Sequence, residues 1–307
     1  MSRIPNVEVR VVGDEDVPAW AHLTAVTVDS GSSLTEPEIA AALAQGTPHM
    51  REISFLAWSM PAARAIARLR LSLHGERAEV WGLGVDPQAA EQGLEPAIIR
   101  AIEARARVSG VRHLLVQVAP NRVSLLTRAG YRLNKARIEM AADLVRRPIS
   151  VDQPLRHPGV NEKEIQAVGR LYYDAYYDTI DYNGETPEDG LDEARRCMTG
   201  DYGPFLAGCS FVIDGEEGLA GAALITQESE DSKDEVLLAE VIVSPRYRGR
   251  GYARLLIQAA MNACLHQGKR RMWLMVTRNN VPAEGLYRRM GFEEVPGSEV
   301  YHLTKEL

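Results

Sequence analysis

The stretch SPRYRGRGYARLL, residues 244–256, places four arginines and two glycines within thirteen positions of a chain whose net charge is −7. The preceding run LAEVIVSP (238–245) is apolar, β-prone and closed by a proline, which predicts a buried strand that ends at a turn. A helix N-terminus offers unpaired backbone N–H groups and partial positive charge, and glycine allows close approach. We therefore expect this turn to bind an anionic group. The alternative is a solvated basic turn that only caps a helix.

The composition of the 307 residues is that of an ordinary globular protein, with 45% hydrophobic and 25% charged residues. The length predicts about two domains. The negative net charge argues against nucleic acid and membranes as partners. The three cysteines, Cys197, Cys209 and Cys264, are widely spaced, which predicts reduced thiols, a cytoplasmic protein and no metal site. No signal peptide and no membrane-spanning run are expected.

The chain repeats one plan twice. In each copy, a buried strand closed by a proline precedes a helix with an apolar stripe, then a second strand, then a short helix that ends in a glycine and an aromatic residue. The strands and short helices of the two copies are 78–87 and 238–245, 112–118 and 271–276, and 125–131 and 286–292. Two copies of this length indicate duplicated domains rather than a solenoid.

A boundary between the copies falls near RRPISVDQPLRHPGV (146–160), where three prolines and no periodicity predict a linker. We therefore divide the chain into residues 1–148 and 149–307. The alternation of strands and helices predicts an α/β fold with a mixed sheet in each half. The other elements that we expect are a strand at 7–12 and helices near 15–28, 35–45, 161–178 and 187–199.

Two motifs give the second half a specific resemblance. RYRGRG (246–251) fits the Q/R-x-x-G-x-G/A signature of the GNAT superfamily of N-acetyltransferases, and NVPAEGLYRRMGF (280–292) fits its second pattern, N-x-x-A-x-x-L-Y-x-x-x-G-F. The likeness covers roughly residues 160–307 well and 5–145 in outline only. The chain thus resembles a tandem GNAT protein: two α/β domains, each a mixed, mostly antiparallel sheet flanked by helices, with a degenerate N-terminal copy.

The resemblance implies acetyl-CoA as the acetyl donor. The anion at the arginine–glycine turn would be the CoA pyrophosphate, held by backbone N–H groups, and the pantetheine arm would pair with the strand before the turn. Asn280 would contact CoA, although it could also serve only as a helix N-cap. The cofactor-binding residues implied are Val241, Ile242, Val243, Arg246, Arg248, Gly249, Arg250, Gly251, Tyr252, Ala253, Asn280 and Tyr287.

The resemblance also implies that an amine attacks the thioester directly, within a complex of both substrates. Tyr287 matches the general acid that protonates the leaving thiolate, and a backbone N–H near Val243 would polarise the carbonyl. Glu240, inside an apolar strand, is the candidate base, because burial would raise its pKa. His302 is a less favoured base. The structural alternatives are a core tyrosine at 287 and a salt-bridged carboxylate at 240.

The acceptor side is predicted at residues 171–196, which are rich in tyrosine and acidic residues. Carboxylates and aromatic faces suit a cationic amine, so we expect Tyr177, Asp178, Asp181 and Glu185 to bind substrate. The alternative is that the tyrosines pack as core and the acids are solvated. The expected function is transfer of acetyl to a primary amine of a small cationic molecule by a monomer whose two domains pair as dimer subunits do. Protein N-terminal acetylation and non-catalytic CoA binding remain alternatives.

The first copy lacks the residues that this chemistry needs. None of the four arginines is present in it. The corresponding pairs, second copy first, are Gly249 and Glu91, Glu240 and Gly82, and Tyr287 and Leu126. A glutamate at the turn would repel a pyrophosphate, and neither glycine nor leucine can transfer a proton. We therefore expect a catalytically silent N-terminal half.

Overall fold

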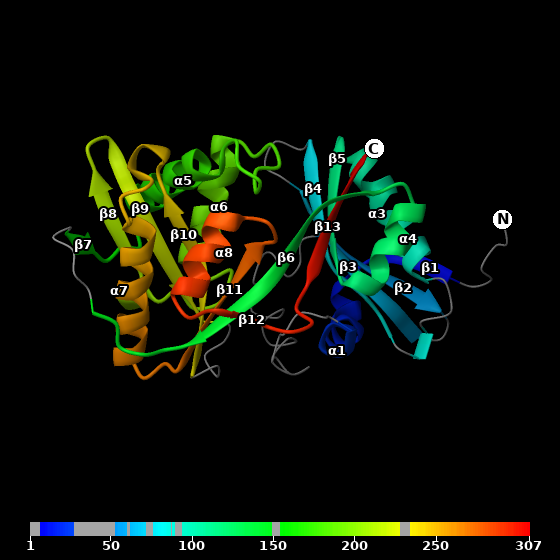
Figure 1. Cartoon of the computed structure of the whole chain (residues 1–307). Helices are drawn as coiled ribbons and strands as arrows, with labels where there is room; N and C mark the ends of the chain where they lie inside the picture. The colour runs from blue at the N-terminus through cyan, green and yellow to red at the C-terminus, as the bar shows by residue number, and fades with distance from the viewer. Residues whose placement is uncertain are drawn as a thin grey trace. The chain divides into compact units, whose positions relative to one another are not determined.

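The computed structural model describes residues 7–27, 53–59, 62–71, 76–86, 88–89, 94–148, 154–227 and 234–307. The helix expected near 35–45 and the glutamate at position 91 lie outside these ranges. The chain forms two compact units, described separately below (Figure 1). The first unit comprises Met1–Ala136 and Glu299–Leu307, and the second comprises Arg137–Ser298.

The first unit contains a mixed sheet in which only β4 and β5 run parallel. Its strands, in sheet order, are β1 (Val7–Val11), β2 (Ile53–Ser59), β3 (Ala62–Leu71), β4 (Arg77–Val85), β5 (His113–Val118) and β13 (Val300–Glu306). Its described helices are α1 (Val17–Thr27), α3 (Leu94–Val108) and α4 (Val123–Arg128). The α3 stripe is buried at Leu94, Ile98 and Ile102, as predicted from its spacing, whereas Arg105 is exposed.

The second unit repeats this sheet order, again with a single parallel pair, β10 and β11. In sheet order its strands are β7 (Leu155–Arg156), β8 (Phe211–Gly215), β9 (Gly218–Thr226), β10 (Glu235–Val243), β11 (Arg271–Thr277) and β6 (Arg132–Asp143), and β12 (Glu293–Glu294) pairs with β6. Its helices are α5 (Glu162–Tyr176), α6 (Pro187–Thr199), α7 (Tyr252–His266) and α8 (Val281–Arg289). The predicted strands and helices of this half are therefore confirmed.

The last strand of each sheet comes from the other half of the sequence. Residues 137–143 of β6 pair with β11 in the second unit, whereas β13, at the C-terminus, pairs with β5 in the first. The predicted division into 1–148 and 149–307 places β6 in the first domain and β13 in the second, whereas the structure has residues 137–143 of β6 in the second unit and β13 in the first. A strand belongs to the sheet whose strands it hydrogen-bonds with. The proline-rich linker marks a break along the sequence but does not indicate which strands will pair.

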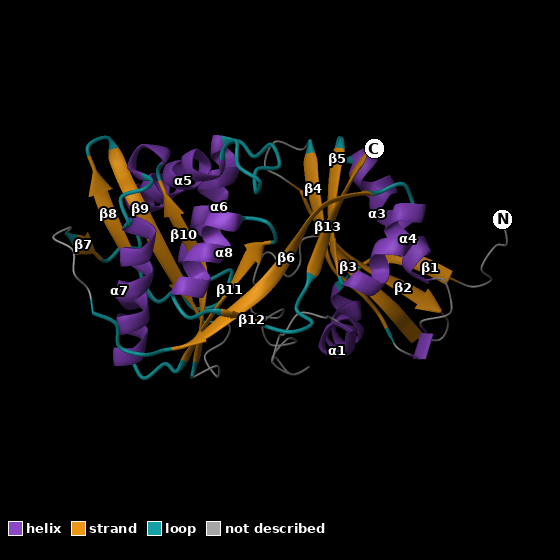
Figure 2. Ribbon diagram, viewed as in Figure 1, coloured by secondary structure: helices purple, strands orange, loops and turns teal. Residues whose placement is uncertain are grey.

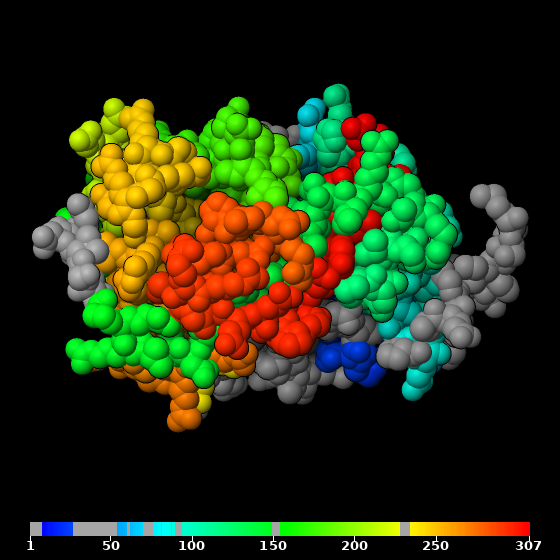
Figure 3. Space-filling view, viewed as in Figure 1, coloured from blue at the N-terminus to red at the C-terminus, as the bar shows by residue number. Residues whose placement is uncertain are grey.

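Helices cover both faces of the second unit's sheet (Figure 2). On one face, α7 and α8 pack on Ile138, Met140 and their buried neighbours. In Figure 3 these two helices are the gold and orange-red atoms. On the other face, α5 and α6 pack on Ala222, Leu224 and Ile242. We call these the α7/α8 face and the α5/α6 face.

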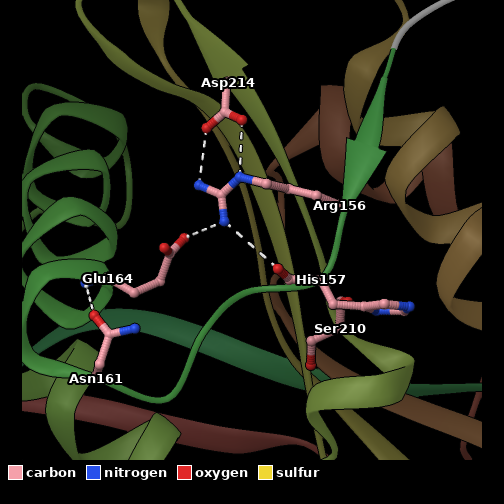
Figure 4. A network of polar contacts seen from close by, with 6 residues as sticks. All are labelled: Arg156, His157, Asn161, Glu164, Ser210 and Asp214. Carbon is pink, nitrogen blue, oxygen red and sulfur yellow. Dashed lines mark hydrogen bonds and ion pairs between the residues drawn. The ribbon is translucent and has the colours of Figure 1, made fainter.

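Arg156 fixes α5 to the edge of this sheet (Figure 4). From β7, its guanidinium makes two hydrogen bonds of 2.8 Å to Asp214 of β8 and an ion pair of 2.9 Å with Glu164 of α5. The bidentate contact lowers the pKa of Asp214. Helix α5 itself begins at Asn161, whose side chain accepts a hydrogen bond from the Glu164 backbone N–H. The N-terminal end of α5 is thereby held at the edge of the sheet.

Candidate functional site

Strands β10 and β11 separate halfway along their length. Their parallel pairing covers only Glu235–Leu237 and Arg271–Trp273, and the register of β10 against β9 shifts between Leu238 and Glu240. We call the region where residues 238–243 of β10 no longer pair with residues 274–277 of β11 the splay. Within the described sheet, this edge of β10 has no strand partner, so an extended ligand could pair with it.

The backbone direction at the end of β10 suits such a ligand. The N–H of Ser244 donates to the carbonyl of Ala220 on β9. Since successive residues of a strand point their backbone groups to opposite edges, the N–H and C=O of Val241 and Val243 face away from β9, toward the splay. Ile242 faces β9, and its side chain belongs to the core on the α5/α6 face.

The arginine–glycine turn follows directly. Gly249 and Gly251 have φ values of 77° and 80°, and a Cβ atom at either would meet nothing within 4 Å. Gly251 caps α7, whose first described backbone bond runs from the N–H of Leu255 to the carbonyl of Gly251. Between Gly249 and Arg254, no backbone N–H donates to another described backbone carbonyl. Two left-handed glycines before a helix N-terminus thus present several N–H groups to one open space.

Three of the four arginines in this stretch contact other described residues through their side chains. Arg246 pairs with Glu217, and the Arg250 guanidinium lies 5.1 Å from the ring centroid of Tyr247. Arg248 donates over 2.6 Å to the carbonyl of Ala175, which ties the turn to the end of α5. Anion binding at this turn would therefore rest mainly on backbone N–H groups, with the arginine charges adding attraction.

Glu240 lies on β10 at the splay, on the α5/α6 face. The hydroxyl of Tyr176 donates a 2.8 Å hydrogen bond to its carboxylate. Burial and then the charge of Glu193 raise the pKa of Glu240 to about 8, against weaker opposing effects of the Tyr176 hydrogen bond and Arg137. Glu240 forms no ion pair with any described cation. The salt-bridged alternative is therefore wrong, and the carboxylate has the basicity of a proton acceptor near neutral pH.

Tyr287 is buried on α8, with its ring 5.8 Å from that of Phe292 in an edge-on contact. Burial, then the negative charge of Glu240, raises the pKa of Tyr287. The phenol therefore keeps its proton at neutral pH. Its hydroxyl makes no hydrogen bond to the described part of the chain, so it can still donate to a ligand.

The predicted acceptor residues divide into two groups. Asp181 accepts hydrogen bonds from the hydroxyl of Thr277 and, over 3.2 Å, from the side chain of Asn280. Asn280 is also the N-cap of α8, accepting from the N–H of Ala283 over 3.3 Å. Asp181 and Asn280 thus fasten the α5–α6 loop beside the splay. Glu185 likewise accepts from the backbone N–H of Asn183 over 2.6 Å and stabilises its own loop.

Tyr177 and Asp178 are instead exposed. The Tyr177 side chain is 54% exposed, and its ring lies 5.6 Å from that of Tyr173 and 5.1 Å from that of Tyr182. Asp178 adopts a left-handed φ of 59°. A loop with an aromatic cluster and an exposed carboxylate can meet a cation, and the substrate role of these residues stays a prediction.

Two site residues were not predicted. Tyr176 lies in the predicted acceptor region, with core packing as the alternative for its tyrosines, but no contact with Glu240 was expected; its hydroxyl donates a hydrogen bond to that carboxylate. Arg137 was assigned to the first domain, yet it lies on β6 opposite Thr277 in the second unit. His302, the less favoured candidate base of the second half, lies instead on β13 opposite Gln117 in the first unit. No local pattern could have shown either reassignment.

The first unit retains the same strand geometry with different chemistry. Its parallel pair, β4 and β5, ends at Val80 and Val116. Gly82, the counterpart of Glu240, has a φ of 62°, and its absent side chain leaves room for Arg68, whose Nε would lie 3.4 Å from a Cβ there. Arg68 is 3% exposed and lies over the ring of Trp20, and burial lowers its pKa to about 10. A buried cation thus stands beside the position that corresponds to the carboxylate.

Comparison with known proteins identifies the second unit. Residues 167–292 match the sequence model of the acetyltransferase (GNAT) family. The second unit therefore matches the GNAT family model over most of its length. The two motifs on which the resemblance was based, RYRGRG (246–251) and NVPAEGLYRRMGF (280–292), lie within the matched residues. Within the described ranges, no helix is long and apolar enough to cross a membrane, and no cluster of potential metal ligands is found.

Individual relatives match over part of their length. Streptothricin acetyltransferase of Streptomyces lavendulae is 36% identical over 84 residues, which are 27% of this chain and 43% of that protein. The [ribosomal protein bS18]-alanine N-acetyltransferase of Haemophilus ducreyi is 32% identical over 69 residues, 22% of this chain and 48% of that protein. The chain therefore spans about half the length of these relatives.

A solved structure extends the likeness to the whole chain. A tandem GNAT protein from the clavulanic acid biosynthesis pathway has a TM-score of 0.71 and 17% identity, and the match covers 98% of both chains. This similarity concerns the fold: an α/β architecture with mixed sheets and flanking helices.

Proposed function

We propose that the chain is an acetyl-CoA-dependent N-acetyltransferase that acetylates a primary amine of a small, cationic molecule. One observation carries the proposal. The unpaired edge of β10 leads directly into the open N–H turn, and Glu240 on that strand is close enough to Tyr287 of α8 to raise its pKa. The relatives support the reaction class, because streptothricin acetyltransferase and the bS18-alanine enzymes are both named as acetyltransferases.

The described residues fit acetyl-CoA. The N–H groups of Gly249 to Ala253 would hold the pyrophosphate, where open space at both glycines leaves room for it. The edge of β10 at Val241–Val243 would pair with the pantetheine amides, because the backbone groups of Val241 and Val243 face the splay. Asn280 would lie at the same mouth, fixed by its contact with Asp181.

The chemistry would need three proton transfers. Glu240 would take a proton from the acceptor ammonium, directly or through water, and the neutral amine would attack the thioester carbonyl. The N–H of Val243 would stabilise the resulting oxyanion. As the C–S bond breaks, Tyr287 would give its proton to the thiolate, and the new C–N nitrogen would lose its second proton, which restores the Tyr287 phenol. The products are the N-acetyl compound and free CoA.

We further propose that the two units are a tandem pair of GNAT domains and that the first is silent. The first unit has Gly82 at the counterpart of Glu240, with buried Arg68 beside it, so it lacks the candidate base. Buried Leu126 occupies the counterpart of Tyr287, so the unit also lacks the general acid. We also propose a cytoplasmic monomer. Size-exclusion chromatography with light scattering tests the oligomeric state, and full-length protein carrying Gly249→Glu tests silence. Acetyl-CoA turnover that this substitution leaves unchanged would point to the first unit.

A second candidate is acetylation of a protein N-terminus, because the bS18-alanine enzymes match the same region. The deciding experiment measures free-thiol release from acetyl-CoA with a panel of small amines, amino acids and N-terminal peptides. We expect turnover with small amines that Glu240→Gln and Tyr287→Phe both reduce. Turnover only with peptides favours the second candidate. Tight acetyl-CoA binding without turnover on any acceptor would favour a non-catalytic protein.

A further inference from the structure

Arg137 lies on the same face of the sheet as the proposed base. Its β6 neighbours Ile138 and Met140 belong to the core on the α7/α8 face. Side chains alternate along a strand, so Arg137 points to the α5/α6 face, as does Thr277, its partner on β11, which contacts Asp181. Arg137 is thus a cation on the α5/α6 face, next to the acceptor-side residue Thr277.

The guanidinium reaches the splay itself. On β6, the N–H of Glu139 donates to Ser298 and its carbonyl accepts from Val295, so both groups point away from β11. Glu139 and Met275 are therefore a non-hydrogen-bonded pair of the β6–β11 ladder. The Met275 carbonyl points away from β6, to the edge of β11 that no longer pairs with β10, which is the splay. Arg137 Nη2 donates to that carbonyl over 3.2 Å. The side chain must cross β11 to make this bond.

Most of the donor capacity of Arg137 is unused. A guanidinium carries five N–H donors, and this one makes a single hydrogen bond, to Met275, and no ion pair with a described carboxylate. Its Nε is fully buried and has no partner. Its positive charge nevertheless lowers the pKa values of Glu240, Tyr176 and Tyr287, each against larger opposing effects. Arg137 is therefore close enough to all three to act on them electrostatically without being neutralised by any.

We propose that Arg137 binds a carboxylate of the acceptor, which makes the acceptor an amino acid or a small molecule that carries both a primary amine and a carboxylate. The planar fork of a guanidinium matches a carboxylate through two parallel hydrogen bonds. With the carboxylate held by Arg137, the ammonium group would lie toward Glu240, its proton acceptor. The inference rests on the proposed function and changes its description of the acceptor: the ammonium group stays the cationic part of the molecule, and a carboxylate is added to it.

The test compares matched acceptors: an amino acid, its amide and its decarboxylated amine, with acetyl-CoA as donor. We expect the wild-type protein to favour the acid in kcat/KM. Arg137→Gln should lower kcat/KM for the acid about 10- to 100-fold, as for loss of a charged hydrogen-bonding partner, and leave the amide within about threefold. Arg137→Lys should recover part of the loss. The control is Arg278→Gln, which removes a partly exposed arginine that pairs with Glu294.

Three results would overturn the inference. The first is an equal loss for acid and amide in Arg137→Gln, which would indicate a structural role. The second is a wild-type protein that uses the amide as well as the acid. The third is a preference for succinyl-CoA over acetyl-CoA that Arg137→Gln removes, because the carboxylate would then belong to the donor.

Failure of the proposed function gives a different result. If no acceptor is acetylated, calorimetry of the acid and the amide with the CoA-saturated protein still tests the carboxylate site. Acid binding that Arg137→Gln weakens would support the inference without turnover. Equal affinities of acid and amide would refute it.

Discussion

Replacing Glu240 by glutamine should lower activity and at the same time stabilise the protein. The carboxamide oxygen can still accept the Tyr176 hydrogen bond, so the change removes chiefly the proton acceptor and the charge. A lost general base typically costs ~10²–10⁴-fold in rate. In the wild type, kcat/KM should rise with pH until the carboxyl ionises, at about 8. This inflection should be absent from the variant.

The stability change has a defined sign. The pKa of Glu240 rises from 4.5 to about 8 in the folded protein, so the folded state holds a proton that the unfolded chain releases. Unfolding therefore becomes easier as pH rises from about 4.5 to 8. At pH 7 the difference is about 3 kcal/mol at one pKa unit per 1.36 kcal/mol, an upper value because the side chain is only half-buried. The glutamine variant avoids this penalty.

Thermal melting from pH 4 to pH 9 is the assay. Wild-type and variant melting temperatures should coincide near pH 4 and diverge above pH 5, with the variant higher by several degrees, given ~2–4 °C per kcal/mol for a unit of this size. Asp178→Asn, which removes an exposed carboxylate, is the matched control and should show no such divergence. A pH-independent difference, or a wild-type rate inflection below pH 6, would refute the reasoning.

Three further substitutions test the rest of the site. Tyr287→Phe should keep CoA affinity and lower kcat by ~10²-fold, and a wild-type rate would make Tyr287 structural. Gly249→Glu should abolish CoA binding by calorimetry, because it adds a carboxylate and a side chain at a φ of 77°; unchanged affinity would remove the turn from the account. Asp181→Asn should raise the acceptor KM by loosening the loop at Thr277, and an unaltered KM would contradict this.

Those features of the site that depend only on residues close together in the sequence could be predicted. The glycine turn at Gly249 and Gly251 could be predicted because positive φ and a following helix are properties of neighbouring residues. The burial of Glu240 could be predicted from the apolar strand around it. The Tyr176 hydrogen bond to Glu240 joins a helix to a strand 64 positions away, and no spacing rule covers that separation. The internal bonds of Glu185 likewise depend on how its loop closes.

The least predictable feature, the exchange of last strands, is also the one that determines which residues make up the site. Because Ile138 and Met140 lie in the core of the second unit, a cut at the proline-rich linker would remove buried apolar side chains worth roughly 1.5–3 kcal/mol each. It would also leave the edge of β11 unpaired and remove Arg137 from the splay. The first half of the sequence therefore supplies the second unit with a structural strand and a charged site residue. The second unit thus needs the first half of the sequence, even though the first half has a glycine at its own counterpart of Glu240.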